Sequence, residues 1–380
     1  MKYVTIIMLV MAWIGQPLAA PTAAQASSPK IYVCPDCGCA TDDRTFDQPG
    51  NCPTCGMQLI EKSANVSTHK TSVAVLLFDG AEVIDYSGPW EAFGEAGFKI
   101  FTVADKTRVV NATFGQKITA DYTFANSPRP DILLVPGGGI HAALDNPDLI
   151  KWVRNTADAA QHVMSVCNGA FILARAGLLD GLSATTVNHE IEHLAQVAPK
   201  TKVVHDKRYV DNGKVITSAG LSSGIDGAFH LISKIKGKGV AQATALGMEY
   251  RWDPNSDFAR AALADRYLPE INDVDGELVS TEGDLNHWEI QALVSKPNSI
   301  PQIIDLISKR IVSKTPHVRG PISLLPVPAT GAGDKSEINW KFTDEDGRDW
   351  KGSALVKPAP DQAGKFSITL KLVREPNEQA

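Results

Sequence analysis

Beyond its first residues the sequence lacks the features of several protein classes. No apolar run after position 26 is long enough to cross a bilayer, which takes about 20 apolar residues in a helix. The net charge is −6, from 37 basic and 43 acidic residues. The chain therefore lacks the basic character typical of proteins that bind nucleic acid or anionic membranes. Cysteine is scarce in most of the chain, because five of the six cysteines lie between positions 34 and 55.

The first 26 residues have the pattern of a secretory signal peptide. Lys2 precedes a largely apolar run over residues 4–14, and Ala24-Gln25-Ala26 matches a small-residue cleavage signal. We expect cleavage after Ala26 and export, which makes the protein periplasmic or secreted. The alternative is an uncleaved membrane anchor, for which the apolar run is short.

Two copies of a C-P-x-C-G turn begin at Cys34 and Cys52. In such a turn the glycine lets backbone N–H groups point at the sulfurs while two thiolates converge on one ion. The repeated spacing predicts a four-thiolate metal site, with Cys39 as a fifth candidate ligand. Zinc and copper both suit such a site, and disulfides are the alternative in an exported chain. The predicted ligands are Cys34, Cys37, Cys52 and Cys55.

A polar stretch over residues 61–71 lacks periodicity and is predicted to be a linker. From Ser72 onward, apolar runs alternate with amphipathic stretches. This pattern predicts βα units, and hence a parallel sheet with helices on both faces. Ligands of such sheets bind beyond the carboxyl ends of the strands. The predicted strands are residues 73–78, 99–104, 132–135, 162–166 and 214–217.

Three helix starts are predicted from local signals. Ser87 is expected to cap a helix that carries Pro89 in its first turn. Asn146 precedes a proline that opens a second helix. Ser223 and Asp226 have the spacing of a capping box before a third helix over residues 227–235.

Cys167 lies between the strand at residues 162–166 and a predicted helix at residues 169–179. Almost nothing separates the two elements, so Cys167 must occupy a sharp turn in which Gly169 relieves crowding. A thiol there faces the positive end of the helix dipole, which favours the thiolate. Nearby backbone N–H groups point where an oxyanion could form. The alternative is a structural cysteine, since cysteine is among the most commonly buried residues.

Two regions resemble known families. Residues 31–62 resemble the short heavy-metal-binding domain of bacterial metal-efflux and copper-handling proteins, through their Tyr-Val-Cys-Pro opening and their Pro-Gly-Asn-Cys-Pro-Thr-Cys-Gly-Met close. Residues 72–252 resemble the ThiJ/PfpI superfamily, whose class I glutamine amidotransferase-like fold is a flavodoxin-like, doubly wound parallel sheet. The matching runs are residues 78–91, 135–139, 165–170, 176–181, 184–186, 217–220 and 223–226.

The second resemblance implies roles for individual residues. Cys167 becomes the nucleophile, and Asp85 becomes the carboxyl group that shares a proton with it. For Asp85 the alternative is a cap at a helix start. The candidates for oxyanion or substrate contacts are Gly137, Gly138, Gly139 and Asn168. For the glycines, a tight turn that needs positive φ is compatible with that role.

The chain departs from the superfamily where some members carry a histidine. Asn168 follows the nucleophile, and Val187 follows the Thr-Thr pair. His189 lies two residues further on and is expected to be a surface histidine. Without a histidine, protease-like or amidotransferase chemistry loses support. The isonitrile hydratases and the sensor domains of certain transcription regulators are the most similar branches, and no helix-turn-helix is evident after Trp252.

Residues 253–380 carry no family resemblance and are predicted to form an α+β or β-rich region. Asp346-Gly347 is a hairpin signal between two alternating runs. Trp340 and Trp350 are expected in the core of that sheet, with a binding face as the alternative. The predicted strands are residues 278–281, 287–293, 337–343, 350–356 and 365–373, and the predicted helix is residues 300–311.

Two functions follow from these patterns. The first is an exported cysteine-dependent hydratase or hydrolase that acts on a small electrophile such as an isonitrile, an aldehyde or an activated carbonyl. It needs no cofactor at Cys167 and has zinc or copper at the cysteine cluster. The second is a non-catalytic sensor of a small ligand, redox state or metal. The resemblance also implies a homodimer. The expected domains are a signal peptide (residues 1–26), a metal domain (30–62), the α/β domain (72–252) and the C-terminal region (253–380).

Overall fold

The computed structural model describes residues 30–34, 44–61, 70–256, 258–269, 276–295, 299–326, 336–360 and 362–376. The predicted signal peptide, Cys37 and Cys39 lie outside these residues. The chain divides between His69 and Lys70 into two compact units, and this boundary falls within the predicted linker. Among the described residues, no helix combines the length and the apolarity that a membrane span requires.

The first unit is a three-stranded antiparallel sheet in the order β2-β1-β3. Its strands are β1 (Tyr32–Val33), β2 (Thr45–Phe46) and β3 (Ile60–Glu61). The buried core consists of two cysteines and one leucine, Cys34, Cys52 and Leu59. So small an apolar core does not stabilise a fold unaided, which is why segments of this kind depend on a metal or on cross-links.

The second unit begins with the predicted α/β sheet. Seven strands pair in the order β13-β14-β10-β9-β4-β5-β8, and every neighbouring pair is parallel except β13 with β14. This order confirms the flavodoxin-like, doubly wound fold. The strands are β4 (Ser72–Leu76), β5 (Lys99–Ala104), β8 (Tyr122–Thr123), β9 (Ile132–Val135), β10 (His162–Val166), β13 (Tyr209–Asp211) and β14 (Val215–Ser218).

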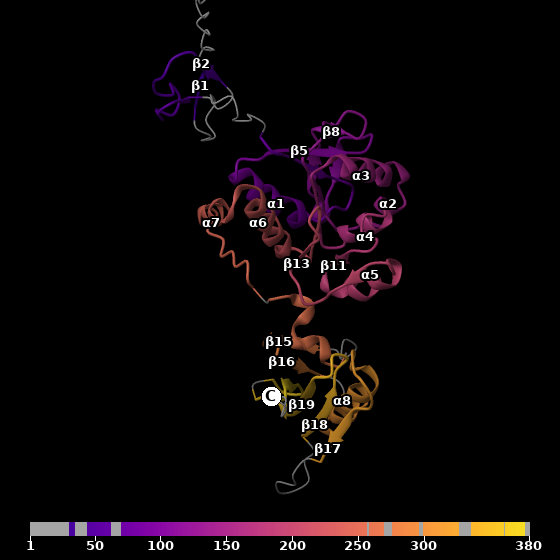
Figure 1. The fold of residues 1–380 in the computed structure, drawn as a ribbon. Helices are drawn as coiled ribbons and strands as arrows, with labels where there is room; N and C mark the ends of the chain where they lie inside the picture. Colours follow the sequence, from indigo (N-terminus) through magenta and orange to yellow (C-terminus); the bar gives the residue numbers. More distant parts are fainter. Residues whose placement is uncertain are drawn as a thin grey trace, which may run out of the picture. The chain divides into compact units, whose positions relative to one another are not determined.

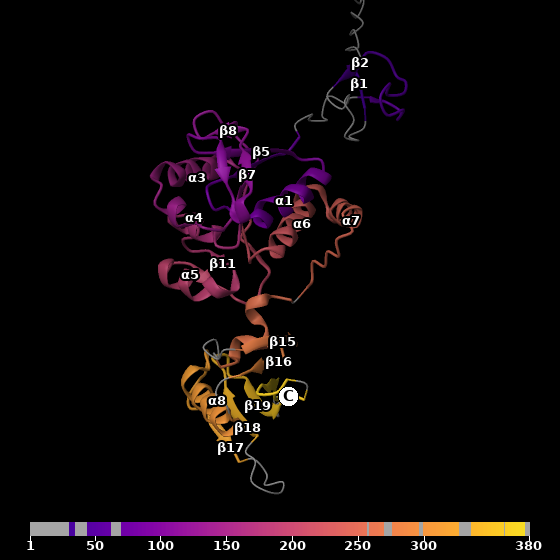
Figure 2. The same cartoon turned by 180° about the vertical axis from the view of Figure 1, so that it is seen from behind.

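Helices cover both faces of this sheet. Figures 1 and 2 show α1, α6 and α7 together on one face and α2, α3 and α4 on the other. The helices are α1 (Val83–Glu95), α2 (His141–Leu144), α3 (Pro147–Ala159), α4 (Gly169–Arg175), α5 (Ile191–Val197), α6 (Ser222–Lys236) and α7 (Lys238–Gly247). Two small ladders complete the domain, formed by β6 (Val109–Asn111) with β7 (Lys117–Thr119) and by β11 (Ser183–Ala184) with β12 (Lys202–Val203). Short 3₁₀ turns are η1 (Thr113–Gly115) and η2 (Asn188–Glu190).

One predicted helix start is confirmed and two are wrong. The Asn146 side chain accepts hydrogen bonds from the N–H groups of Asp148 and Leu149 and so caps α3. In contrast, α1 starts at Val83, four residues before the predicted cap at Ser87, and Pro89 lies inside it.

The second error concerns α6, which starts at Ser222, with no side chain capping it. Asp226 binds Arg208 and Tyr250 instead of forming a capping box. The residues that begin α1 and α6 are held by tertiary contacts: Glu82 N–H donates to the Gly137 carbonyl, and Leu221 N–H donates to Asp85. Such contacts override local capping signals, which is why the local sequence pointed to the wrong starts.

The C-terminal region is a six-stranded antiparallel sheet in the order β15-β16-β20-β19-β18-β17, with α8 packed on β18 and β19. The predicted β-rich character is confirmed, and Trp340 and Trp350 are fully buried in its core. The elements are β15 (Gly276–Gly283), β16 (His287–Val294), α8 (Ile300–Lys314), β17 (Ser323–Leu325), β18 (Glu337–Thr343), β19 (Asp349–Pro358) and β20 (Phe366–Arg374), preceded by η3 (Arg260–Ala262) and η4 (Ala264–Tyr267).

Two helical glycines offer a matched test of how closely α6 packs on the strand that leads to Cys167. A Cβ at Gly224 would lie 2.7 Å from Val166 Cγ1, whereas a Cβ at Gly239 in α7 would meet nothing within 4 Å. We expect Gly224→Ala to destabilise the domain by about 1–3 kcal/mol through overpacking. Gly239→Ala should stabilise it by up to about 1 kcal/mol, because alanine favours the helix. Chemical denaturation followed by circular dichroism measures both, and equal effects would contradict the packing argument.

Candidate functional site

Cys167 occupies a strained turn between β10 and α4. Its backbone φ is +58°, a left-handed conformation that residues other than glycine rarely adopt. The neighbouring strand holds the turn, because Cys167 N–H donates to the carbonyls of Ser218 and Ala219. The Thr186 hydroxyl donates to the Cys167 carbonyl at 2.9 Å. A Cβ at Gly169 would lie 2.4 Å from the Val135 carbonyl oxygen, so the predicted need for glycine beside the turn is confirmed.

Asp85 lies in the first turn of α1 and is fully buried. Its Oδ2 accepts the Gly137 N–H at 3.0 Å, and its Oδ1 accepts the Leu221 N–H at 3.2 Å. The Asp85 carboxyl group also lies near the Cys167 thiol, so that each of the two groups shifts the pKa of the other. The structure therefore brings Cys167 and Asp85 together at the carboxyl edge of the sheet.

Burial raises the pKa of both groups in this pair. For Asp85, burial outweighs the stabilising Gly137 N–H and raises the pKa of the carboxyl to about 7. For Cys167, burial and then the Asp85 charge raise the pKa of the thiol, while the Asn168 N–H lowers it. The predicted promotion of the thiolate by the helix start is thus outweighed. Near neutral pH the buried pair retains a proton, and Asp85 is the group poised to exchange it.

The prediction that the three glycines donate to an oxyanion is corrected by the structure, because their N–H groups already form hydrogen bonds within the fold. Gly137 N–H binds Asp85, Gly138 N–H donates to Asn168 Oδ1 at 2.7 Å, and Gly139 N–H donates to the Gly80 carbonyl at 2.8 Å. Gly137 and Gly138 instead permit close approach of the backbone, and the positive φ of the turn interpretation is found at Gly138.

Gly137 and Gly138 leave no space for a side chain. A Cβ at Gly137 would lie 2.2 Å from Asn168 Oδ1, and one at Gly138 would lie 2.2 Å from the Gly80 carbonyl oxygen. Gly138 also has a φ of +119°. Asn168 Nδ2 returns a hydrogen bond to the Gly138 carbonyl at 3.0 Å. Asn168 therefore locks the glycine loop against the turn, and its own N–H is directed at the Cys167 sulfur.

A small cavity of about 90 Å³ is lined by residues that hold the pair in place, although neither Cys167 nor Asp85 lines it. Val187 and Leu221 line it, and Leu221 is the residue whose N–H holds Asp85. His205 also lines the cavity, and burial lowers the pKa of its imidazole, which favours the neutral form. Sequence reasoning missed His205, since it lies in a loop after β12 and outside every matching run. The histidine that it did weigh, His189, is exposed.

The described part of the cysteine cluster is brought together in the first unit. Ligand atoms of Cys34, Cys52 and Cys55 all lie within 4.8 Å of one another. The sulfurs of Cys34 and Cys55 are 3.5 Å apart, well beyond a disulfide bond. Gly56 has a φ of +76°, as the C-P-x-C-G turn requires. Three convergent thiolates fit a soft metal ion, which would cross-link the two turns. The other candidate ligands, Cys37 and Cys39, lie outside the described residues.

Comparison with known proteins gives two family matches. Residues 71–234 match the DJ-1/PfpI family, and residues 31–62 match the heavy metal binding domain. Isonitrile hydratase from Pseudomonas putida is 30% identical over 190 residues, which cover 49% of this chain and 81% of that protein. The HTH-type transcriptional regulator CdhR from Pseudomonas aeruginosa is 30% identical over 159 residues, covering 42% of this chain and 47% of the regulator.

Among solved structures, a ThiJ/PfpI family protein from Pseudomonas syringae matches with a TM-score of 0.46 and 28% identity, over 52% of this chain and 84% of that one. Enzymes and regulators thus share the domain, so its presence alone does not select a function. The identity with a relative matched over most of its length, together with the matched segment that contains both Asp85 and Cys167, leads to one conclusion. This chain belongs to the DJ-1/PfpI family.

Proposed function

We propose that this protein is an exported cysteine-dependent enzyme of the hydratase or hydrolase type, acting on a small electrophilic substrate. The observation that carries the proposal is the buried pair of Cys167 and Asp85, in which each group shifts the pKa of the other. The similarity to an isonitrile hydratase supports an isonitrile as substrate, with aldehydes and activated carbonyls as further classes. Export is part of the proposal, and a mature protein that begins at Ser27 is its expected product.

The reaction begins with transfer of the thiol proton. The Asp85 carboxylate accepts this proton as Cys167 Sγ forms a bond with the electrophilic carbon. With an isonitrile, the same carbon then takes the proton from Asp85, and a thioimidate results. Water adds across the carbon–nitrogen bond of the thioimidate, and the carbon–sulfur bond breaks as the sulfur regains a proton. The net reaction adds one water to the isonitrile and releases an N-substituted formamide.

The surroundings of the pair suit a small substrate. The cavity of about 90 Å³ behind Ala219 and Leu221, which hold the pair, has room for only a few non-hydrogen atoms. Val187 contributes an apolar wall, and the Asn168 N–H at the start of α4 stabilises negative charge on the sulfur. These features favour a compact electrophile over a peptide.

Substitution of the nucleophile tests the proposal directly. Cys167→Ser should lower turnover of any accepted isonitrile or aldehyde by about 10³-fold or more, because a hydroxyl is a far weaker nucleophile. His189→Ala is the matched control, since His189 is exposed and should leave turnover unchanged. A substrate screen on the full chain measures both variants. Full activity of Cys167→Ser on every accepted substrate would overturn the proposal.

The Cys167–Asp85 pair also predicts a pH dependence. The pKa of the Asp85 carboxyl is about 7. At a pH below this value the carboxyl is protonated and cannot accept the thiol proton, whereas at a higher pH the carboxylate can. Alkylation of Cys167 by iodoacetamide should therefore accelerate as the pH rises through about 7. Asp85→Asn should abolish this rise in alkylation rate around pH 7, because the asparagine amide does not titrate. Peptide mass spectrometry follows Cys167 separately from the other cysteines.

A second candidate function is a non-catalytic sensor. It is favoured by the low exposure of the Cys167 residue, 8%, and by the transcriptional regulators among the relatives. The alkylation experiment separates the two functions. An alkylation rate that stays flat around pH 7 and below that of a free thiol would contradict the enzyme and favour ligand sensing.

We further propose that the first unit binds zinc or copper through Cys34, Cys52 and Cys55, with Cys37 or Cys39 completing the set. Protein purified without added metal should contain about one metal ion per chain, as a four-thiolate site holds one ion. Cys52→Ala should lose that metal and unfold the first unit, because the described apolar core is only Cys34, Cys52 and Leu59 with Tyr32 and Phe46 packed against them. Cys167→Ala, outside the cluster, should retain it. Metal analysis decides, and a metal-free protein with disulfides in this segment would contradict the site.

A further inference from the structure

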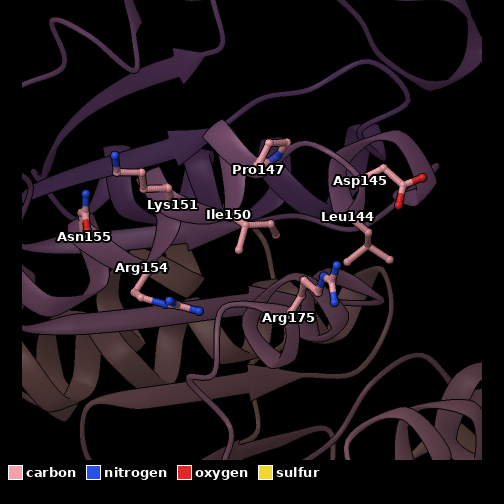
Figure 3. Close-up of a pocket in the computed structure, with 8 residues that line it drawn as sticks. All are labelled: Leu144, Asp145, Pro147, Ile150, Lys151, Arg154, Asn155 and Arg175. Carbon is pink, nitrogen blue, oxygen red and sulfur yellow. The ribbon is translucent and has the colours of Figure 1, made fainter.

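A second cleft lies on the α/β domain, apart from the residues that surround Cys167. It has a volume of about 600 Å³, which is in the range of small-molecule sites. It lies between α3, the loop that precedes it, and the end of α4 opposite to Cys167. Figure 3 shows Ile150 in the middle of the cleft, with Arg154 on one side of it and Arg175 on the other.

The cleft gathers positive charge. Lys151, Arg154 and Arg175 line it, and Asp145 is the acidic residue among the lining residues. Within the part of the chain that the structure describes, none of the three cations forms an ion pair. Other exposed lysines of the same domain do so, as Lys200 with Asp180 at 2.9 Å illustrates. The cleft therefore holds three cationic groups whose charge the fold leaves unneutralised.

Arg154 is held in position by the protein. Its Nε donates to the Ala176 carbonyl at 2.8 Å, just after the last turn of α4. This bond orients the guanidinium group and leaves its terminal nitrogens available as donors. Arg175 occupies the last turn of the same helix, and its guanidinium lines the same cleft. The two arginines lie on opposite sides of Ile150, and each guanidinium group can bind an oxyanion in bidentate fashion.

Apolar surface accompanies these donors. Leu144, Pro147 and Ile150 line the cleft beside the arginines. Inorganic ions gain nothing from such surface, whereas a ligand with a hydrocarbon part does. We propose that this cleft binds a small organic anion, whose carboxylate or phosphate group contacts the positioned Arg154, whose apolar part packs on Ile150 and whose charge is attracted by Arg175 across the cleft. The site is independent of the chemistry proposed at Cys167.

Calorimetric titration of the full chain with four probes tests the site. The probes are hexanoate, hexyl phosphate, inorganic phosphate and hexanol. We expect hexanoate or hexyl phosphate to bind more tightly than inorganic phosphate and hexanol, and the comparison of the two organic anions identifies the preferred head group. Arg154→Ala should weaken that binding by about tenfold, the effect of losing a charge-assisted hydrogen bond, and Arg175→Ala should weaken it by a smaller factor, because its charge acts from across the cleft. Added salt should weaken it too.

Arg251→Ala is the matched control, since it removes an exposed arginine in the segment after α7, on the opposite face of the sheet. It should leave the affinity unchanged. Circular dichroism establishes that each variant is folded. The proposal is overturned if no organic anion binds at millimolar concentration, if hexanol binds as tightly as hexanoate, or if inorganic phosphate binds as tightly as hexyl phosphate. Unchanged affinity in both arginine variants overturns it as well.

Discussion

The buried Asp85 carboxyl group is the contact on which the arrangement of the site depends. It joins the first turn of α1 to the loop after β9 through Gly137, and to the loop after β14 through Leu221. Its third contact is with Cys167, directly after β10. Because β4, β9, β10 and β14 are consecutive neighbours in the sheet, these loops meet at one edge. A single carboxyl group can therefore bridge all of them, and the sheet order makes that convergence possible.

This arrangement is unfavourable in two respects that point to function. Burial disfavours the charged form of Asp85 and so raises the pKa of the carboxyl to about 7. Cys167 and Leu221, which both contact it, have φ values of +58° and +55°. Each such conformation costs about 1–3 kcal/mol and persists only where the surrounding structure enforces it. Relaxing all three residues would stabilise the fold, and strain gathered at one edge of a sheet is typical of a functional site.

The sequence was sufficient to predict the elements that depend on local pattern. Strands at residues 99–104, 132–135 and 162–166 follow from continuous apolar runs, and the turn at Cys167 follows from the missing space between strand and helix. It was insufficient where partners come from distant loops. Gly137 could be placed at a strand end, but only the structure shows that its N–H binds Asp85. His205 and the starts of α1 and α6 were missed for the same reason, because long-range contacts fix them.

For the proposed enzyme, the absence of a histidine at positions 168 and 187 restricts the chemistry rather than abolishing it. Amide hydrolysis expels an amine, which must receive a proton as it leaves. A histidine first takes the proton from the nucleophile and then gives it to the amine. Addition of a thiol to an isonitrile or an aldehyde expels no leaving group, and the proton that leaves sulfur returns to the substrate itself. One carboxyl whose pKa is near 7 can take and return that proton. Asn168 instead fixes the glycine loop through its side chain, where some family members place the histidine. This exchange of a titrating residue for a structural one favours addition over hydrolysis of stable amides.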